Sequence, residues 1–203
     1  MNKLIVSLLL TLGISGVAHA AGDAAAGQAK AAVCGACHGP DGNSMAPNFP
    51  KLAGQGERYL NKQLHDIKSG KRTVLEMTGL LNNLSDQDLA DIAAYFASQK
   101  GSVGAADPKL VARGEALFRG GNLDKGLPAC TGCHSPDGKG NAAAGFPHLG
   151  GQHAQYVGKQ LTDFRKEEGG RTNDGDTKPM QSIAKKLSDE DIAAVSSYIQ
   201  GLH

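Results

Sequence analysis

Residues 34–38 read Cys-Gly-Ala-Cys-His, and residues 130–134 read Cys-Thr-Gly-Cys-His. Each pentapeptide has the form C-x-x-C-H, the attachment signature of a c-type haem. On a helical turn, two thiols at this spacing reach the vinyl groups on one edge of a porphyrin, and the next histidine becomes the proximal iron ligand. The motifs contain all four cysteines of the chain and predict two covalently bound haem c groups. The predicted attachment residues are Cys34, Cys37, Cys130 and Cys133.

A C-x-x-C pair has other uses, namely a thiol redox pair, half of a zinc site, or a disulfide. A redox pair does not need histidine in the next position, and here that histidine occurs twice. A zinc site would need further ligands at finger-like spacing, and none stands near either motif. Two disulfides would leave the duplicated histidine unexplained. Haem attachment accounts for the whole pattern.

The first twenty residues have the form of a cleavable export signal. Lys3 gives a positive start, residues 4–17 are mostly apolar, and residues 18–20 read Ala-His-Ala, a small-x-small cleavage site. The apolar run is short for a membrane span, although an uncleaved N-terminal anchor is the alternative. The signal predicts export to the periplasm, an oxidising compartment in which this kind of haem attachment takes place.

The remaining 183 residues suit two small domains, predicted at 21–103 and 104–203. The chain has no Trp, and only 4% of its residues are aromatic, so each core is marginal on apolar burial alone. A haem in each domain would supply a large apolar body to pack around. The formal net charge is +1, and no block of like charge suggests a nucleic-acid partner.

The two halves repeat the same order of elements. Asp23 and Asp107 are candidate N-caps of a helix before each motif, and Pro108 suits a first helical position. Each motif is therefore expected at or just after the end of that helix. Pro50 lies twelve residues after His38, and Pro147 lies thirteen after His134. A carbonyl in this loop could accept a hydrogen bond from the histidine Nδ1, the alternative being an ordinary rigid turn.

A second pair of helices is indicated by matching residues over 59–66 and 156–163. Unequal loops follow, over 68–76 and 167–179. The last helices are predicted to start at Ser85 and Ser188, which are good N-caps followed by acidic residues. They are expected to end at residues 95–96 and 198–199. Residues 100–106 are predicted to link the halves.

The second axial ligand is predicted to be methionine in both halves. Met77 and Met180 each lie seven residues before the matched Leu-Ser helix start, whereas Met45 has no counterpart. A single Met is more often core filler, but equivalent positions in both repeats argue for a shared role. The rival histidines are not duplicated, and they are His65, His148, His153 and the terminal His203. We therefore predict His38/Met77 ligation for the first haem and His134/Met180 for the second.

This ligand set decides the predicted chemistry. Iron with His and Met ligands has no open position, so it passes electrons and does not bind oxygen or peroxide. Thioether sulfur favours the reduced iron and raises the reduction potential. The protein then sets potential and access, while the haem carries the electron.

The chain resembles the cytochrome c4 family of di-haem, two-domain class I cytochromes c over residues 21–203. The resemblance is carried by the paired motifs, the Phe-Pro loops, Met77 and Met180, and the twin Leu-Ser-Asp helices. It implies an all-α fold of two tandem cytochrome c-type helical domains related by pseudo-two-fold symmetry, each with one c-type haem, with the propionates facing each other. It also implies electron transfer in the periplasm from a respiratory complex to a terminal oxidase, with loose association with the membrane surface. We expect a monomer.

Two other functions compete with the carrier. A di-haem subunit of a larger enzyme, such as a flavocytochrome, would share these motifs. A di-haem peroxidase would need one open or displaceable iron ligand, against which the matched methionines argue. The sequence therefore favours an electron carrier that is not an enzyme.

Overall fold

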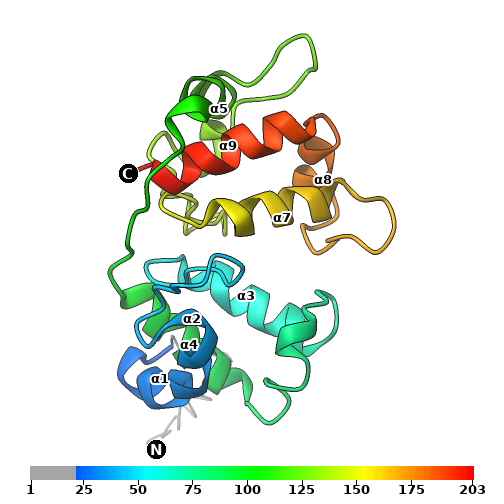
Figure 1. The fold of residues 1–203 in the computed structure, drawn as a ribbon. Helices are drawn as coiled ribbons and strands as arrows, with labels where there is room; N and C mark the ends of the chain where they lie inside the picture. The colour runs from blue at the N-terminus through cyan, green and yellow to red at the C-terminus, as the bar shows by residue number, and fades with distance from the viewer. Residues whose placement is uncertain (1–21) are drawn as a thin grey trace, which may run out of the picture.

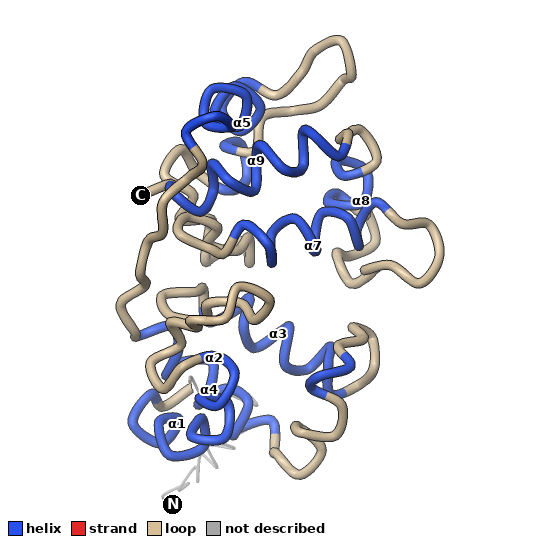
Figure 2. The backbone as a smooth tube through the Cα atoms, viewed as in Figure 1, coloured by secondary structure: helices blue, strands red, loops and turns tan. Residues whose placement is uncertain are grey.

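The computed structural model describes residues 22–203, and they form helices joined by loops (Figures 1 and 2). The predicted export signal lies outside the described residues. Two isolated antiparallel bridges, Asn122–Leu127 and Asn141–Phe146, occur among the loops. None of the helices in the described part is long and apolar enough to cross a membrane. The elements in chain order are α1 (Ala24–Lys30), η1 (Ala31–Cys34), α2 (Gly35–His38), α3 (Glu57–Lys68), η2 (Leu75–Met77), α4 (Asp86–Ser98), α5 (Pro108–Gly120), α6 (Thr131–His134), α7 (Ala154–Arg165), α8 (Pro179–Ala184) and α9 (Asp189–Gly201).

The same helix packing occurs in both halves. The first helix of each half packs against the last, α1 on α4 and α5 on α9, and α3 and α7 pack against the same last helices. The predicted N-caps are confirmed, because the Asp23 side chain accepts from Ala25 N–H and the Asp107 side chain from Lys109 N–H. Ser85 and Ser188 each form a capping box with the aspartate three residues later. The local sequence therefore determines the residue at which each of these helices begins.

A glycine lies at each crossing of a first helix with a last helix. A Cβ added to Gly114 would lie 2.3 Å from the Ala194 carbonyl oxygen and 2.6 Å from Tyr198 Cβ. A Cβ added to Gly27 would lie 2.0 Å from the Asp91 carbonyl oxygen. Real Cβ atoms do not come so close to backbone, so only glycine permits these helices to approach at this separation.

Two sequence expectations about helix ends are wrong. α4 and α9 continue to Ser98 and Gly201, beyond the predicted ends at 95–96 and 198–199, and in α9 the two added residues precede the buried Leu202. The second motif does not follow directly on α5, because residues 121–129 intervene. Gly121, with φ of 68°, ends α5, and the loop closes through paired backbone hydrogen bonds between Asn122 and Leu127, both 2.8 Å. Each half has its own hydrophobic core, called here the first and the second core. Leu127 is 3% exposed and holds this loop to the second core.

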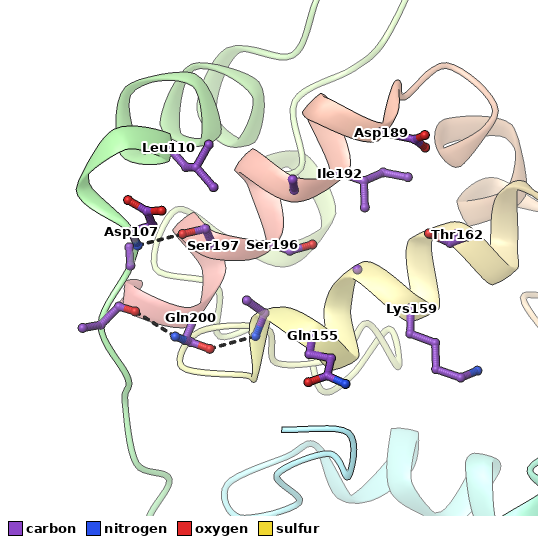
Figure 3. Close-up of a pocket in the computed structure, with 15 residues that line it drawn as sticks. Asp107, Leu110, Gln155, Lys159, Thr162, Asp189, Ile192, Ser196, Ser197 and Gln200 are labelled. Carbon is purple, nitrogen blue, oxygen red and sulfur yellow. Dashed lines mark hydrogen bonds between the residues drawn. The ribbon is translucent and has the colours of Figure 1, made fainter. Parts of the chain in front are cut away.

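The C-terminal helix also ties down the connection between the halves (Figure 3). Ser197 Oγ accepts from the Asp107 backbone N–H at 2.8 Å. Gln200 donates through Nε2 to the Ala105 carbonyl at 2.7 Å and accepts through Oε1 from Ala154 N–H at 2.9 Å. Residues 99–107 contain no helix, as predicted for a linker, but these contacts fix their course beside α9.

The two halves meet in a reciprocal polar interface, and α3 and α7 face each other across it (Figure 1). Gln55 donates to the His148 carbonyl at 2.9 Å and accepts from His148 N–H at 2.7 Å. Gln152 makes the same pair of bonds with the backbone of Lys51, both at 2.9 Å. Equivalent residues of the repeat thus contact each other in both directions, which is the mark of a two-fold axis.

Asp191, in the first turn of α9, is a buried carboxylate held by two cations. It accepts from Arg113 Nη2 and from Lys125 Nζ, each at 2.6 Å, and its side chain is 4% exposed. Burial acts to raise the pKa of Asp191, but the hydrogen bonds from Lys125 and Arg113 outweigh it and hold this pKa well below its usual range. Asp191 therefore stabilises the fold above its unfolded pKa of about 3.9, and the contribution is lost as pH falls through the folded pKa.

We expect Asp191→Asn to lower the free energy of unfolding by about 2 kcal/mol at pH 7, because charge-assisted hydrogen bonds are lost. The difference from wild type should shrink below about pH 4, where the wild-type advantage itself declines. Denaturant unfolding between pH 7 and pH 2.5 measures both effects. Asp189→Asn, at an exposed position of the same turn, is the control and should change stability little. Equal losses in the two variants would contradict this role for Asp191.

Candidate functional site

The two attachment motifs occupy short helical turns. Cys34 ends η1 and Cys37 lies in α2, while Cys130 caps α6 and Cys133 lies within it. None of the four cysteines forms a disulfide. Burial raises the pKa of Cys34 and raises that of Cys130 to about 11. A thiol redox pair uses a depressed thiolate pKa, so these environments do not fit that alternative.

The histidine of each motif is buried and oriented by a proline carbonyl. His38 Nδ1 donates to the Pro50 oxygen at 2.9 Å, and His134 Nδ1 donates to the Pro147 oxygen at 3.0 Å. The sequence left open whether a carbonyl of the Phe-Pro loop accepts from the histidine or the loop is only a rigid turn, and the structure shows the carbonyl contact in both halves. A carbonyl only accepts, so the proton must sit on Nδ1 and the Nε2 lone pair remains for a metal. Burial lowers the pKa of both histidines, which keeps them neutral as ligands must be.

The structure places the two predicted methionines differently. Met180 is the second residue of α8 and packs against the second core, which Cys130 also borders. Met77 ends η2 and is half-buried, but it is not among the residues packed against the first core. The unmatched Met45 is 93% exposed. The fold thus places Met180 and Cys130 beside the same hydrophobic core. Met77 does not border the first core, so the predicted ligation by Met77 has less support from the packing.

The rival histidines are engaged elsewhere. His65 donates through Nδ1 to the Asn61 carbonyl at 2.8 Å within α3. His148 Nδ1 lies 3.2 Å from the Gly54 oxygen, and His153 Nε2 lies 2.8 Å from the Ser44 oxygen, both across the interface. His203 Nδ1 bonds to the nearby Gly201 oxygen at 3.0 Å.

Sequence reasoning missed a symmetric arginine cluster between the halves. Arg72 donates to Gln63 of its own half at 2.9 Å, and across the interface to Tyr156 at 2.9 Å and Gln160 at 3.0 Å. Arg171 repeats this pattern, with bonds to Gln160 of its own half at 2.8 Å, and across the interface to Tyr59 at 3.1 Å and Gln63 at 2.9 Å. The sequence feature that could have revealed this cluster is the Arg-Thr pair that occurs at 72–73 and again at 171–172, in loops of unequal length.

These six residues, called here the arginine cluster, carry excess positive charge. Among residues 22–203, no carboxylate oxygen lies within 4.0 Å of either guanidinium. Burial acts to raise the pKa of Tyr59, but the charges of Arg171 and Arg72 outweigh it and lower this pKa. A half-buried guanidinium pair that no carboxylate among residues 22–203 contacts directly, although Asp66 acts on Arg72 from farther away, suits the carboxylates of a ligand. Together with the unpaired cysteines of the two motifs and the neutral histidines, the donor set fits haem with its propionates.

Comparison with known proteins agrees with these features. The family model for cytochrome c matches residues 24–100 and 111–203. The chain is 84% identical over 203 residues to a protein of Pseudomonas aeruginosa named cytochrome c4, with all of both chains covered. A crystal structure of reduced recombinant cytochrome c4 from Pseudomonas stutzeri has a TM-score of 0.88 and 71% identity, covering 90% of this chain and 100% of that chain. The predicted all-α fold of two cytochrome c-type domains is confirmed.

A more distant relative bears a different name. A protein of Stutzerimonas stutzeri named thiosulfate dehydrogenase electron acceptor is 38% identical over 176 residues, covering 83% of this chain and 78% of that protein.

Proposed function

The chain belongs to the cytochrome c4 family of di-haem electron carriers, and we propose that it passes single electrons in the periplasm from a respiratory donor to a terminal oxidase. It binds two covalent haem c groups and is a carrier, not an enzyme. The observation that carries the proposal is the pair of buried histidines, each with Nδ1 fixed by a proline carbonyl. We expect the protein to act as a monomer loosely associated with the membrane surface.

Each residue of the proposed site has one task. Cys34, Cys37, Cys130 and Cys133 would hold the porphyrins through thioether bonds. His38 and His134 would be the proximal ligands, and Met77 and Met180 would close the opposite side. The haem, when bound, supplies reversible one-electron chemistry. The Pro50 and Pro147 carbonyls hold the histidine protons on Nδ1, which makes each imidazole a more basic ligand.

The arginine cluster supplies positive charge beside the boundary between the halves. We propose that Arg72 and Arg171 receive propionate carboxylates, for which their forked donors are suited. A fixed positive charge also favours the form of a redox centre that has gained an electron. The cluster should therefore raise the reduction potentials.

Arg171→Leu is expected to lower at least one midpoint potential, by on the order of tens of millivolts, because one partly desolvated positive charge is removed. Spectroelectrochemical titration of the holoprotein measures the change. Arg119→Leu is the control, since Arg119 is exposed and bonds within the second half to Glu115 and Tyr198. A potential that moves equally in both variants would refute a special role for the cluster.

The spectrum of the oxidised holoprotein tests the proposed function directly. Two haems per chain, a full-strength Met-to-ferric-iron band from both, and no carbon monoxide binding after reduction are expected for two closed sites. A half-strength band with carbon monoxide binding would mean one open iron, and the carrier assignment would give way to an enzyme such as a peroxidase.

A second donor class is favoured by the relative named thiosulfate dehydrogenase electron acceptor. In that case the electrons would come from a periplasmic dehydrogenase that oxidises a small inorganic sulfur compound. Stopped-flow reduction of the ferric holoprotein by such a dehydrogenase, compared with reduction by a respiratory quinol-oxidising complex, separates the two donors. The faster donor at equal concentration identifies the physiological class.

A further inference from the structure

The loop that precedes Met180 crosses to the other half of the molecule. Asn173 Nδ2 donates to Gln63 Oε1 at 3.0 Å and to Asp66 Oδ2 at 2.7 Å, both on α3. Lys62 Nζ, also on α3, donates to the Asn173 carbonyl at 2.8 Å. These three bonds anchor a second-half loop on a first-half helix. Asp66 is buried, at 8% exposed, so the anchor is a fixed part of the first half.

The residue after Asn173 holds the start of α8. Asp174 Oδ2 accepts from the Gln181 backbone N–H at 3.0 Å, and Asp174 Oδ1 accepts from Gln181 Nε2 at 2.7 Å. The position that normally caps a helix is taken by Lys178, whose side chain cannot accept a hydrogen bond. Asp174 therefore satisfies a first-turn N–H that the cap residue leaves unmet.

The backbone at the start of α8 needs this support. Lys178 adopts the left-handed region, with φ of 46° and ψ of 50°, which is unfavourable for a residue with a side chain. Pro179 follows at the first helical position, and Met180 comes next. The bonds from Asp174 to Gln181 bridge this strained turn and fix the segment that carries Met180.

The first half has no such device. The repeated Arg-Thr pair is followed by Asn173 and Asp174 in the second half, but by Val74 and Leu75 in the first. Leu75 is 78% exposed, and neither apolar side chain can accept a hydrogen bond. The loop before Met77 is tied to α7 of the other half through Arg72, as the second loop is tied to α3 through Arg171, but it has no counterpart of the Asn173 bonds or of the surrogate cap.

We propose that Asn173 and Asp174 are positioning residues that hold Met180 in its ligating place by anchoring its loop to α3 of the first half. This inference rests on the proposed His134/Met180 ligation. It makes retention of Met180 depend on the bonds of Asn173 across the interface and on the cap supplied by Asp174, neither of which has a counterpart before Met77.

Displacement of methionine by imidazole in the ferric holoprotein tests the proposal. Asp174→Ala is expected to tighten imidazole binding at the second haem about tenfold, because Met180 is held less firmly, while the first haem keeps its wild-type affinity. Asn173→Ala should act in the same direction with a smaller change. Asp174→Asn keeps one acceptor for the Gln181 N–H and should restore most of the wild-type affinity. Asp176→Ala, at an exposed residue of the same loop, is the control and should match wild type.

The outcomes separate this inference from the ligand assignment. The imidazole phase of the second haem is identified as the one that Met180→Ala changes. If Met180→Ala changes that phase and Asp174→Ala leaves it as in Asp176→Ala, the positioning role is wrong and the ligation stands. If Asp174→Ala only lowers stability to denaturant, or shifts both haems equally, the positioning role is also wrong. If Met180→Ala changes neither phase, the proposed ligation itself fails.

Discussion

Replacing Met180 with alanine is expected to open the sixth position of the second haem iron while leaving the haem attached. In the proposed site the thioether bonds come from Cys130 and Cys133, so attachment should not depend on Met180. Loss of the sulfur removes a ligand that favours the reduced iron, and axial ligands span about 0.8 V of haem potential. We expect the second midpoint potential to fall by on the order of 100 mV or more. The reduced variant should bind one carbon monoxide per chain.

The matched control for this prediction is Met45→Ala. Met45 is 93% exposed and has no counterpart in the other half, so its loss should change neither potential nor carbon monoxide binding. Met77→Ala should open the first site in the same way. A Met180→Ala protein that keeps both potentials and excludes carbon monoxide would show that another residue closes the second haem.

Gly114→Ala is expected to destabilise the second half by about 3 kcal/mol or more, because the new Cβ would overlap backbone at a helix crossing. The added atom would lie 2.3 Å from the Ala194 carbonyl oxygen and 2.6 Å from Tyr198 Cβ. Neither group is a flexible side-chain end, so relief requires α5 to move away from α9. Guanidinium unfolding of the holoprotein, followed by far-ultraviolet circular dichroism, measures the loss.

Gly120→Ala supplies the comparison within the same helix. Nothing lies within 4 Å of a Cβ added at Gly120. Alanine is also the better helix former, so this variant should be neutral or more stable by up to about 1 kcal/mol. Similar destabilisation of the two variants would mean that helix propensity or expression, and not the crossing, sets the effect.

Local features of the fold follow from the sequence by itself. The caps at Asp23, Asp107, Ser85 and Ser188 occur where the residue pattern predicted them. A carbonyl acceptor for His38 and His134 was one of two alternatives that the sequence left open, and the acceptors lie only twelve and thirteen residues from the rings. Contacts of this range form between residues of one continuous stretch of chain. The repeat strengthened each prediction by showing it twice.

The sequence was less informative where the two halves differ. The sequence did not reveal that residues 121–129 separate α5 from the second motif. An irregular loop has no hydrophobic periodicity by which it could be recognised. The ends of α4 and α9 were placed two residues too early, and at α9 the residue that follows the helix is the buried Leu202. Here the competing influence was tertiary packing, which overrides local preference.

The sequence by itself predicted two covalent haem c groups and determined where the capped helices begin. Only the tertiary structure decided how the halves meet, through the glutamine pairs, the arginine cluster and the loop anchored by Asn173. These bonds join residues 84 to 112 positions apart. Their partners are ordinary polar side chains with no local pattern, and they acquire a role only when folding closes those separations. That is why the cofactor could be predicted from two pentapeptides, while the contacts between the halves could not.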